Sequence, residues 1–161
     1  MSEVIKVGMA DLNVCKAPDV ITTLGLGSCI GLVLYDPVTK VGGMVHYMLP
    51  DSTKIRQNQN KLKFADTGIQ ALVEELEKQG LSRKNMIAKI AGGAKMFQFS
   101  SDTAMGNIGE KNVEAVREVL KQYGIKIVSE DVGLNYGRTI VFDPVTKDLT
   151  VVTAGKQTHI I

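Results

Sequence analysis

Two stretches with helical periodicity stand among a longer series of short, β-rich runs, and this combination limits the folds open to the chain. In residues 64–80 and 107–124, apolar side chains recur at spacings of three and four, which places them on one face of a helix. Each stretch ends at a glycine, a residue that often follows the last helical turn. We therefore expect two amphipathic helices, with apolar faces made by Ile69, Leu72, Val73 and Leu76 and by Val113, Val116, Leu120 and Tyr123.

Most of the remaining chain favours strands. The runs show period-two alternation or a short apolar core, and residues 29–36 are apolar enough for a strand buried on both faces. Two helices cannot cover so many strands. The sequence therefore predicts an α/β fold of mixed β-sheets with covering helices, layered as an α-β-β sandwich. The expected strands lie within residues 3–14, 19–25, 29–36, 41–49, 86–97, 125–133, 137–144 and 148–155.

The pentapeptide DPVTK occurs twice, at residues 36–40 and 143–147, each time between two strand patterns. Aspartate followed by proline suits the first two positions of a type I turn. Two β-hairpins are therefore expected at these places.

Length and charge exclude several classes of protein. With 161 residues the chain has the size of one domain, and a net charge of +2 gives no basic footprint for nucleic acid. It has no apolar run of 18 residues for membrane insertion and no signal-peptide core at its start. Two cysteines without a secretory signal indicate free thiols in the cytoplasm.

The stretch TLGLGSCIGLVLYD, residues 23–36, sets Cys29 directly after a glycine-rich run. Glycine is used where the backbone bends sharply or is approached closely, so this cysteine is a candidate nucleophile. A nucleophilic thiol needs a nearby base, and His46 lies on the next expected strand. A hairpin turning near Val38 and Thr39 would bring residue 29 opposite residue 48, within two positions of His46.

Plainer interpretations of both residues stay open at this point. Cys29 could be a buried structural thiol, and a histidine on an apolar strand is often a packing residue. The cysteines and histidines show no spacing typical of a zinc site, so no metal is expected. Cys15 lacks a glycine-rich setting, and His159, near the end of the sequence, is expected to fray on the surface.

The segment PDSTKIRQNQNK, residues 50–61, follows the strand that carries His46 and is expected to form a mobile loop bordering the same opening. This loop contains three basic residues, Lys54, Arg56 and Lys61, and a fourth, Lys63, follows it two residues later. Such a loop would suit an acidic partner, although basic loops are often only solvated surface.

Over nearly its whole length the chain resembles the CheD family, the glutamine deamidases of bacterial and archaeal chemotaxis. The motifs that carry the resemblance are TLGLGSCIGLVLYDP, GGMVHYMLP, AGGAKMF, NIGEKN and the final GR of DVGLNYGR. The resemblance implies one domain over residues 1–161. The chain departs from the family pattern in the segment DVGL, where the family often has two glycines in a row and this chain has Gly133 followed by Leu134.

On this resemblance, Cys29 is the nucleophile, His46 is the base and Thr23 is the third member, acting through its hydroxyl or its carbonyl. Deamidation also needs donors for an oxyanion, and the backbone amides of Cys29 and of Gly27 or Ser28 are candidates. No metal or organic cofactor is expected.

The implied substrate is a glutamine on the cytoplasmic domain of a chemoreceptor, and the implied partner is the phosphatase CheC. The protein is expected to be a monomer when free. Two alternatives remain: an adaptor that mainly binds CheC and receptors, with weak catalysis, and a cysteine amidase or peptidase with another substrate.

Overall fold

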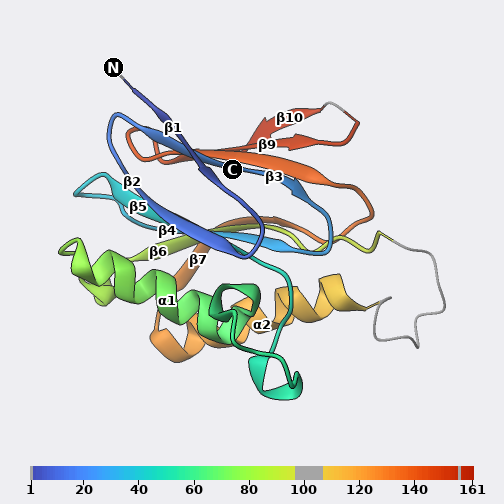
Figure 1. Cartoon of the computed structure of the whole chain (residues 1–161). Coiled ribbons are helices and arrows are strands. Elements are labelled where there is room, and N and C mark those ends of the chain that lie inside the picture. Colours follow the sequence, from blue (N-terminus) through green and yellow to red (C-terminus); the bar gives the residue numbers. More distant parts are fainter. Residues whose placement is uncertain (1, 97–106, 156) are drawn as a thin grey trace.

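The fold consists of three layers: two β-sheets stacked face to face, and a pair of helices packed on one of them (Figure 1). The structure is a computed structural model that describes residues 2–96, 107–155 and 157–161. The prediction of a layered α-β-β sandwich is confirmed.

The outer sheet has the strand order β1-β3-β8-β9-β10. β1 pairs with β3 in parallel, and the other neighbours are antiparallel. The bounds are Val4–Val7 for β1, Val20–Leu26 for β3, Arg138–Asp143 for β8, Asp148–Thr153 for β9 and Thr158–Ile160 for β10.

The inner sheet lies between the outer sheet and the helices and has the order β2-β5-β4-β6-β7 (Figure 1). Its neighbours are antiparallel except β6 and β7, which are parallel. Every residue of β4 is buried, as its apolar sequence predicted. The bounds are Asp11–Lys16 for β2, Ile30–Asp36 for β4, Val41–Tyr47 for β5, Ile87–Gly92 for β6 and Lys126–Val132 for β7.

Both predicted helices are present, as α1 (Ala65–Lys78) and α2 (Ile108–Tyr123). All four apolar positions predicted for α1 are buried. In α2, Val116 and Leu120 are buried, while the other two predicted positions are half-buried. The helices therefore close one apolar core against the inner sheet, and a second core fills the space between the two sheets.

The two DPVTK segments form the hairpins β4–β5 and β8–β9, as predicted. In each turn the aspartate side chain accepts a backbone N–H two residues on, from Val38 to Asp36 and from Val145 to Asp143, both at 2.8 Å. The described residues also form three single-turn 3₁₀ helices. These are η1 (Ser52–Lys54), within the predicted loop, η2 (Lys61–Lys63), which begins at its last residue, and η3 (Arg83–Asn85).

Two expectations were wrong. Residues 3–14 form two strands in different sheets, because the chain turns at Gly8–Ala10 and alternation alone does not reveal a turn. The end of the sequence does not fray at His159, because residues 158–160 pair with β9 as an edge strand.

Neither α1 nor α2 is long and apolar enough to cross a membrane, and the same holds for every helix in the described ranges.

Candidate active site

Cys29 lies where the chain crosses from the outer sheet to the inner sheet. β3 ends at Leu26 and β4 begins at Ile30, so the residues Gly27, Ser28 and Cys29 form the whole connection. The Cys29 thiol is free and half-buried. We call these three residues the crossing turn.

His46 is fully buried on β5, beside the strand that Cys29 precedes. The β4–β5 register pairs Ile30 with Tyr47 and Gly31 with His46. Continued by one step, it places Cys29 opposite residue 48, as the hairpin geometry predicted. Cys29 and His46 are thus diagonal neighbours, whose Cα atoms lie about 7–8 Å apart in such ladders.

Thr23, on β3 of the outer sheet, contacts His46 across the gap between the sheets. Its Oγ1 lies 2.7 Å from His46 Nδ1 and 2.7 Å from the carbonyl oxygen of Val7. The carbonyl can only accept, so the single hydroxyl hydrogen goes to Val7, and Thr23 Oγ1 accepts the N–H of His46 Nδ1. The side chain of Thr23, rather than its carbonyl, therefore holds the imidazole.

This contact fixes the tautomer of His46. With its hydrogen on Nδ1, the neutral ring carries a lone pair on Nε2. Nε2 is buried, and among the described residues it has no hydrogen-bond partner. A buried nitrogen in this state is able to accept a proton from a group that approaches it.

Gly31 makes the contact between the sheets possible. A Cβ atom at Gly31, the residue opposite His46, would lie 2.7 Å from Ile140 Cδ1 and 3.0 Å from Leu26 Cδ1. Both distances are shorter than ordinary carbon contacts, so a larger residue would push the outer sheet away. The glycine lets Thr23 come close enough to hold His46.

Three carbonyl groups of the crossing turn are held from outside. The N–H of Ala94 donates to Gly27 and that of Gly93 to Cys29, both at 2.9 Å, and Asn112 Nδ2 donates to Ser28 at 2.8 Å. A trans peptide points its N–H opposite to its C=O. The Ser28 amide therefore points away from Ala94, and the Cys29 amide points away from Asn112.

Burial shifts the pKa values of Cys29 and His46 in opposite directions. It raises the pKa of the Cys29 thiol, an effect that the residue's own backbone N–H partly offsets. It lowers the pKa of His46. Both shifts favour the neutral thiol and imidazole over the thiolate and imidazolium.

The other cysteine is far less suited to reaction. Cys15 lies on β2 opposite Gly42, four residues along β5 from His46. Its Sγ lies 3.0 Å from the carbonyl oxygen of Asp19, to which the thiol donates, and burial with nearby Asp19 and Asp143 raises its pKa to about 12.

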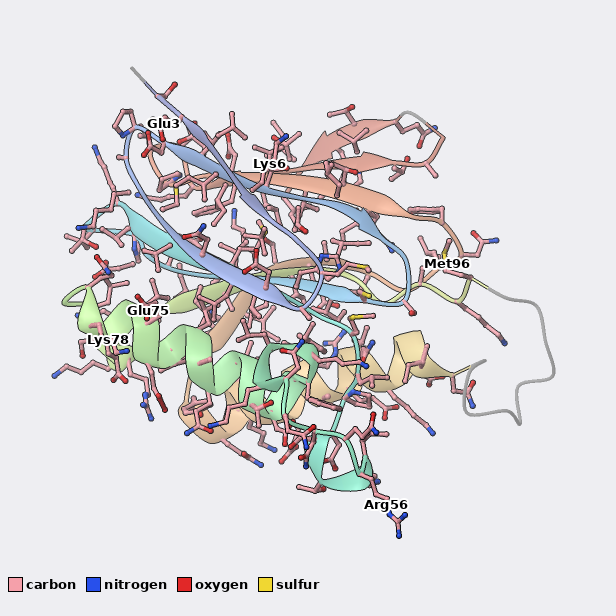
Figure 2. All side chains as sticks on the ribbon, viewed as in Figure 1. Glu3, Lys6, Arg56, Glu75, Lys78 and Met96 are labelled. Carbon is pink, nitrogen blue, oxygen red and sulfur yellow. The ribbon has the colours of Figure 1, made fainter. Side chains whose placement is uncertain are left out.

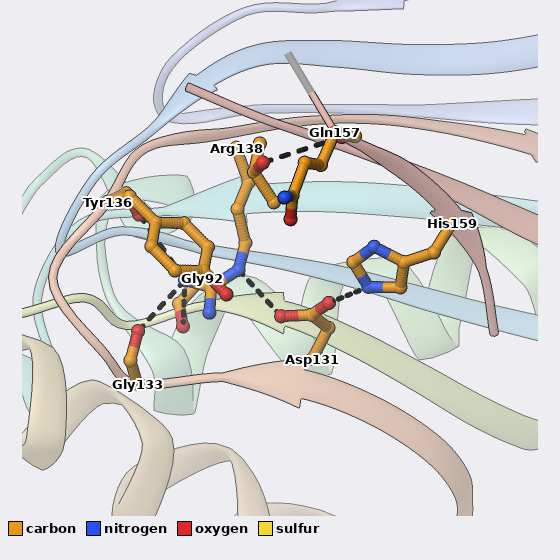
Figure 3. Close-up of polar contacts among 8 residues, drawn as sticks. Gly92, Asp131, Gly133, Tyr136, Arg138, Gln157 and His159 are labelled. Atoms are coloured by element: carbon orange, nitrogen blue, oxygen red, sulfur yellow. Dashed lines mark hydrogen bonds and ion pairs between the residues drawn. The ribbon is translucent and has the colours of Figure 1, made fainter. Parts of the chain in front are cut away.

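A buried arginine supports the strand end next to the crossing turn (Figure 3). The guanidinium of Arg138 on β8 donates to the Asp131 carboxylate at 2.8 Å and to the carbonyl oxygen of Gly133 at 3.0 Å. It also reaches the Gly92 carbonyl at 3.4 Å, and His159 contacts the other oxygen of Asp131. His159 is therefore part of this cluster and lies apart from His46.

The loop after β5 faces the helix layer. Leu49, Pro50 and Ile55 line a groove of about 650 Å³ against α2. Met96 lies next to the crossing turn, since a Cβ atom at Gly27 would lie 3.2 Å from its Cγ. Arg56 points outward on the helix side, away from Met96 (Figure 2). The idea that this loop borders the Cys29 opening stays a prediction.

Within residues 2–96, 107–155 and 157–161, no three Cys, His, Asp or Glu side chains gather in a group that could hold a metal ion.

Comparison with known proteins places these features in a family. A family model described as CheD chemotactic sensory transduction matches residues 48–153. A protein of Lachnoclostridium phytofermentans named "Probable chemoreceptor glutamine deamidase CheD" is 61% identical over 156 residues, 97% of each chain. The chain belongs to the CheD family.

Two further CheD proteins are similar to this chain over nearly its whole length. The one from Caldanaerobacter subterraneus subsp. tengcongensis carries the same name and is 56% identical, over 96% of this chain and 95% of its own. The one from Halalkalibacterium halodurans, named "Chemoreceptor glutamine deamidase CheD", is 52% identical over 95% of each. The family match begins at residue 48, beyond Thr23, Cys29 and His46, so the roles of these residues stay predictions.

Leu134 stands where the resemblance leads us to expect a second glycine, and its backbone conformation is one that favours glycine. Gly133 and Leu134 both have positive φ angles, 80° and 60°, a conformation that glycine adopts without strain. The Leu134 carbonyl accepts the N–H of Lys95 at 2.8 Å, close to the residues that hold the crossing turn. The leucine therefore occupies a position suited to glycine.

Several residues of the site could not be found from the sequence. Gly31 and the buried side chains of Asn112 and Arg138 lie within the CheD motifs, but no local pattern indicates what each contacts. Asn112 reaches Ser28 from 84 positions away. The one sequence signal for Asn112 is that a polar residue stands on the otherwise apolar face of the predicted helix.

Proposed function

We propose that this protein deamidates glutamine side chains of chemoreceptors to glutamate, with Cys29 as the nucleophile and His46 as the base. The names of the relatives support the reaction and its substrate. The observation that carries the residue roles is the state of His46. Its Nδ1 is held by Thr23, and its buried Nε2 has no partner in the described part of the chain.

The reaction begins with attack of Cys29 Sγ on the carbon of the substrate carboxamide, while the thiol proton moves to His46 Nε2. Because burial favours the neutral form of both groups, we propose that this proton moves during the attack rather than before it. The negative charge then develops on the carboxamide oxygen. The backbone amides of Cys29 and Ser28 are its proposed donors, and the backbone at Gly27 has no side chain of its own to hinder a close approach.

The intermediate collapses when His46 returns the proton to the departing nitrogen, which leaves as ammonia, and Cys29 is left as a thioester. A water molecule, deprotonated by His46, attacks the thioester carbon. The C–S bond breaks, the thiolate recovers the proton from His46, and the released carboxylic acid loses its own proton to the solvent to become glutamate. Thr23 keeps the imidazole in one tautomer through both halves of the cycle.

Membership of the CheD family supports the rest of the proposal. Residues 1–161 act as one domain in the cytoplasm and need no cofactor, and the phosphatase CheC is a protein partner. In the adaptor alternative, the chain would bind CheC and receptors but contribute little hydrolysis.

The proposal is tested by incubating the protein with a purified receptor cytoplasmic fragment and measuring the fragment's intact mass. Each hydrolysed amide adds about one dalton, as –NH₂ is replaced by –OH. We expect the parent and Cys15→Ala to produce this gain and Cys29→Ala to produce none. Full activity of Cys29→Ala would refute the nucleophile, and an inactive parent that still binds CheC would favour the adaptor.

A further inference from the structure

The ladder between β4 and β5 stops just short of the reacting groups. Its last pair is Ile30 with Tyr47, so Cys29 lies one residue beyond the paired region, and His46 one residue within it. Gly93 and Ala94 hold Cys29 and Gly27 from the side of β6, but no β4–β5 pair fixes the separation of Cys29 and His46. Another element must hold the open end of the ladder.

Asn112 of α2 bridges this open end. Its Nδ2 donates to the carbonyl oxygen of Ser28 at 2.8 Å and to that of Met48 at 2.9 Å. Ser28 directly precedes Cys29, and Met48 follows His46 by two residues. We propose that Asn112 is a positioning residue that sets the separation of Cys29 and His46; this inference rests on the function proposed above.

A side-chain amide meets the chemical requirement of the bridge. Both partners are carbonyl oxygens, which accept only, so the group between them must supply two hydrogens from one atom. The two hydrogens of a planar –NH₂ group diverge by about 120°, which places their acceptors about 5 Å apart. This is close to the roughly 4.7–4.9 Å between neighbouring strands, so Asn112 continues the strand spacing past the last ladder pair.

The bridge is itself held firmly. Asn112 is fully buried, and its backbone carbonyl accepts the hydroxyl of Tyr47, the neighbour of His46, at 2.5 Å. One turn earlier in α2, a Cβ at Gly109 would lie 2.4 Å from the carbonyl oxygen of Ala94. The start of α2 therefore packs against the same segment that holds Gly27 and Cys29.

The test compares Asn112→Ala and Asn112→Leu with Val116→Ala. The first two remove the bridge, and the leucine keeps most of the volume. Val116→Ala is the matched control, because Val116 is fully buried in the helix core on α2, four residues on, and its apolar side chain cannot form the hydrogen bonds of the bridge. The readouts are kcat and KM for deamidation, and the pH profile of iodoacetamide alkylation at the peptide that contains Cys29.

We expect a loss of tenfold or more in kcat for both Asn112 variants, with KM within about twofold of the parent, because displacements on the order of 1 Å at reacting groups can cost about a hundredfold in rate. We also expect the midpoint of the Cys29 alkylation profile to move. Val116→Ala should lose stability but keep the parent's kcat and profile.

Three results would overturn the inference: parental kcat and alkylation in the Asn112 variants, equal losses in Val116→Ala, or failure of both Asn112 variants to fold while Val116→Ala folds. The alkylation profile needs no substrate. It therefore reports on Asn112 even if Cys29→Ala retains activity and the proposed function itself is wrong.

Discussion

At the scale of single residues, one hydroxyl determines what His46 can do. Thr23 must donate to Val7, and for that reason it can only accept from His46. A histidine on an apolar strand would otherwise be free to carry its hydrogen on either nitrogen. The contact therefore turns a buried packing residue into one with a defined basic nitrogen.

Replacement of Thr23 by valine should remove this control. Valine has nearly the same shape but no acceptor for the Nδ1 hydrogen, so the wrong tautomer becomes populated and kcat should fall by about ten- to a hundredfold or more. Thr23→Ser keeps the oxygen and should retain most of the activity. The tautomer can be followed by ¹⁵N NMR of the His46 ring, and an unchanged spectrum and kcat in Thr23→Val would show that the hydroxyl has no such role.

At the scale of the elements, the approach of β3 to the inner sheet depends on a residue without a side chain. Gly31 on β4 lies opposite His46, and its missing Cβ leaves room for Ile140 and Leu26 of the outer sheet. The packing of two sheets and the polar contact between Thr23 and His46 are thus linked at one position.

Gly31→Ala should therefore reduce stability and activity together. A methyl group 2.7 Å from Ile140 Cδ1 must displace the outer sheet, and such overpacking costs about 1–3 kcal/mol. Gly8→Ala is the matched control, since its Cβ would meet nothing nearer than Asp11 Oδ2 at 3.9 Å, and a change within about 0.5 kcal/mol is expected there. Urea unfolding and kcat measure both effects; equal stability of the two variants would contradict the packing argument.

Periodicity explains which elements could be predicted from the sequence. The two helices and both DPVTK hairpins are local patterns of spacing and turn chemistry, and they were found. The division of residues 3–14 into β1 and β2 was missed, because alternation continues across the turn at Gly8–Ala10. The glycine-rich run and the hairpin geometry point to Cys29 and His46, and the resemblance adds Thr23. The contacts of Asn112 and Arg138 join distant segments and leave no local pattern.

At the scale of the whole molecule, the site lies inside the sandwich rather than on one of its outer faces. His46 is fully buried between layers, and burial lowers its pKa, so the folded protein resists protonation there. The unfolded chain has no such restriction, and its histidines titrate near 6.5. The stability of the whole fold is therefore coupled to the proton on this ring.

The free energy of unfolding should decrease as the pH falls below about 6.5. Above that value His46 is neutral in both states and has no effect, whereas below it the unfolded chain gains a proton that the folded protein does not. The slope from this one group is at most about 1.4 kcal/mol per pH unit, and it ends below the lowered pKa of the folded state. Urea unfolding between pH 7.5 and 5 measures it.

His46→Gln provides the comparison, since glutamine does not titrate and offers an N–H of its own. The difference in unfolding free energy between the parent and this variant should shrink as the pH falls from 6.5 toward 5. A difference that stays constant over this range would mean that His46 is protonated equally well in the folded protein.

The way the crossing turn is held has a consequence for attempts to transplant the site. Gly27, Ser28 and Cys29 owe their shape to Ala94, Asn112 and Gly93, which belong to other parts of the chain. A designer who copied only the glycine-rich peptide into a different hairpin would move the thiol without the parts that hold it. A working copy needs the end of β6 and the start of α2 as well, and it needs β3 and β1 of the outer sheet, which supply Thr23 and its partner Val7. The smallest portable unit therefore includes parts of all three layers.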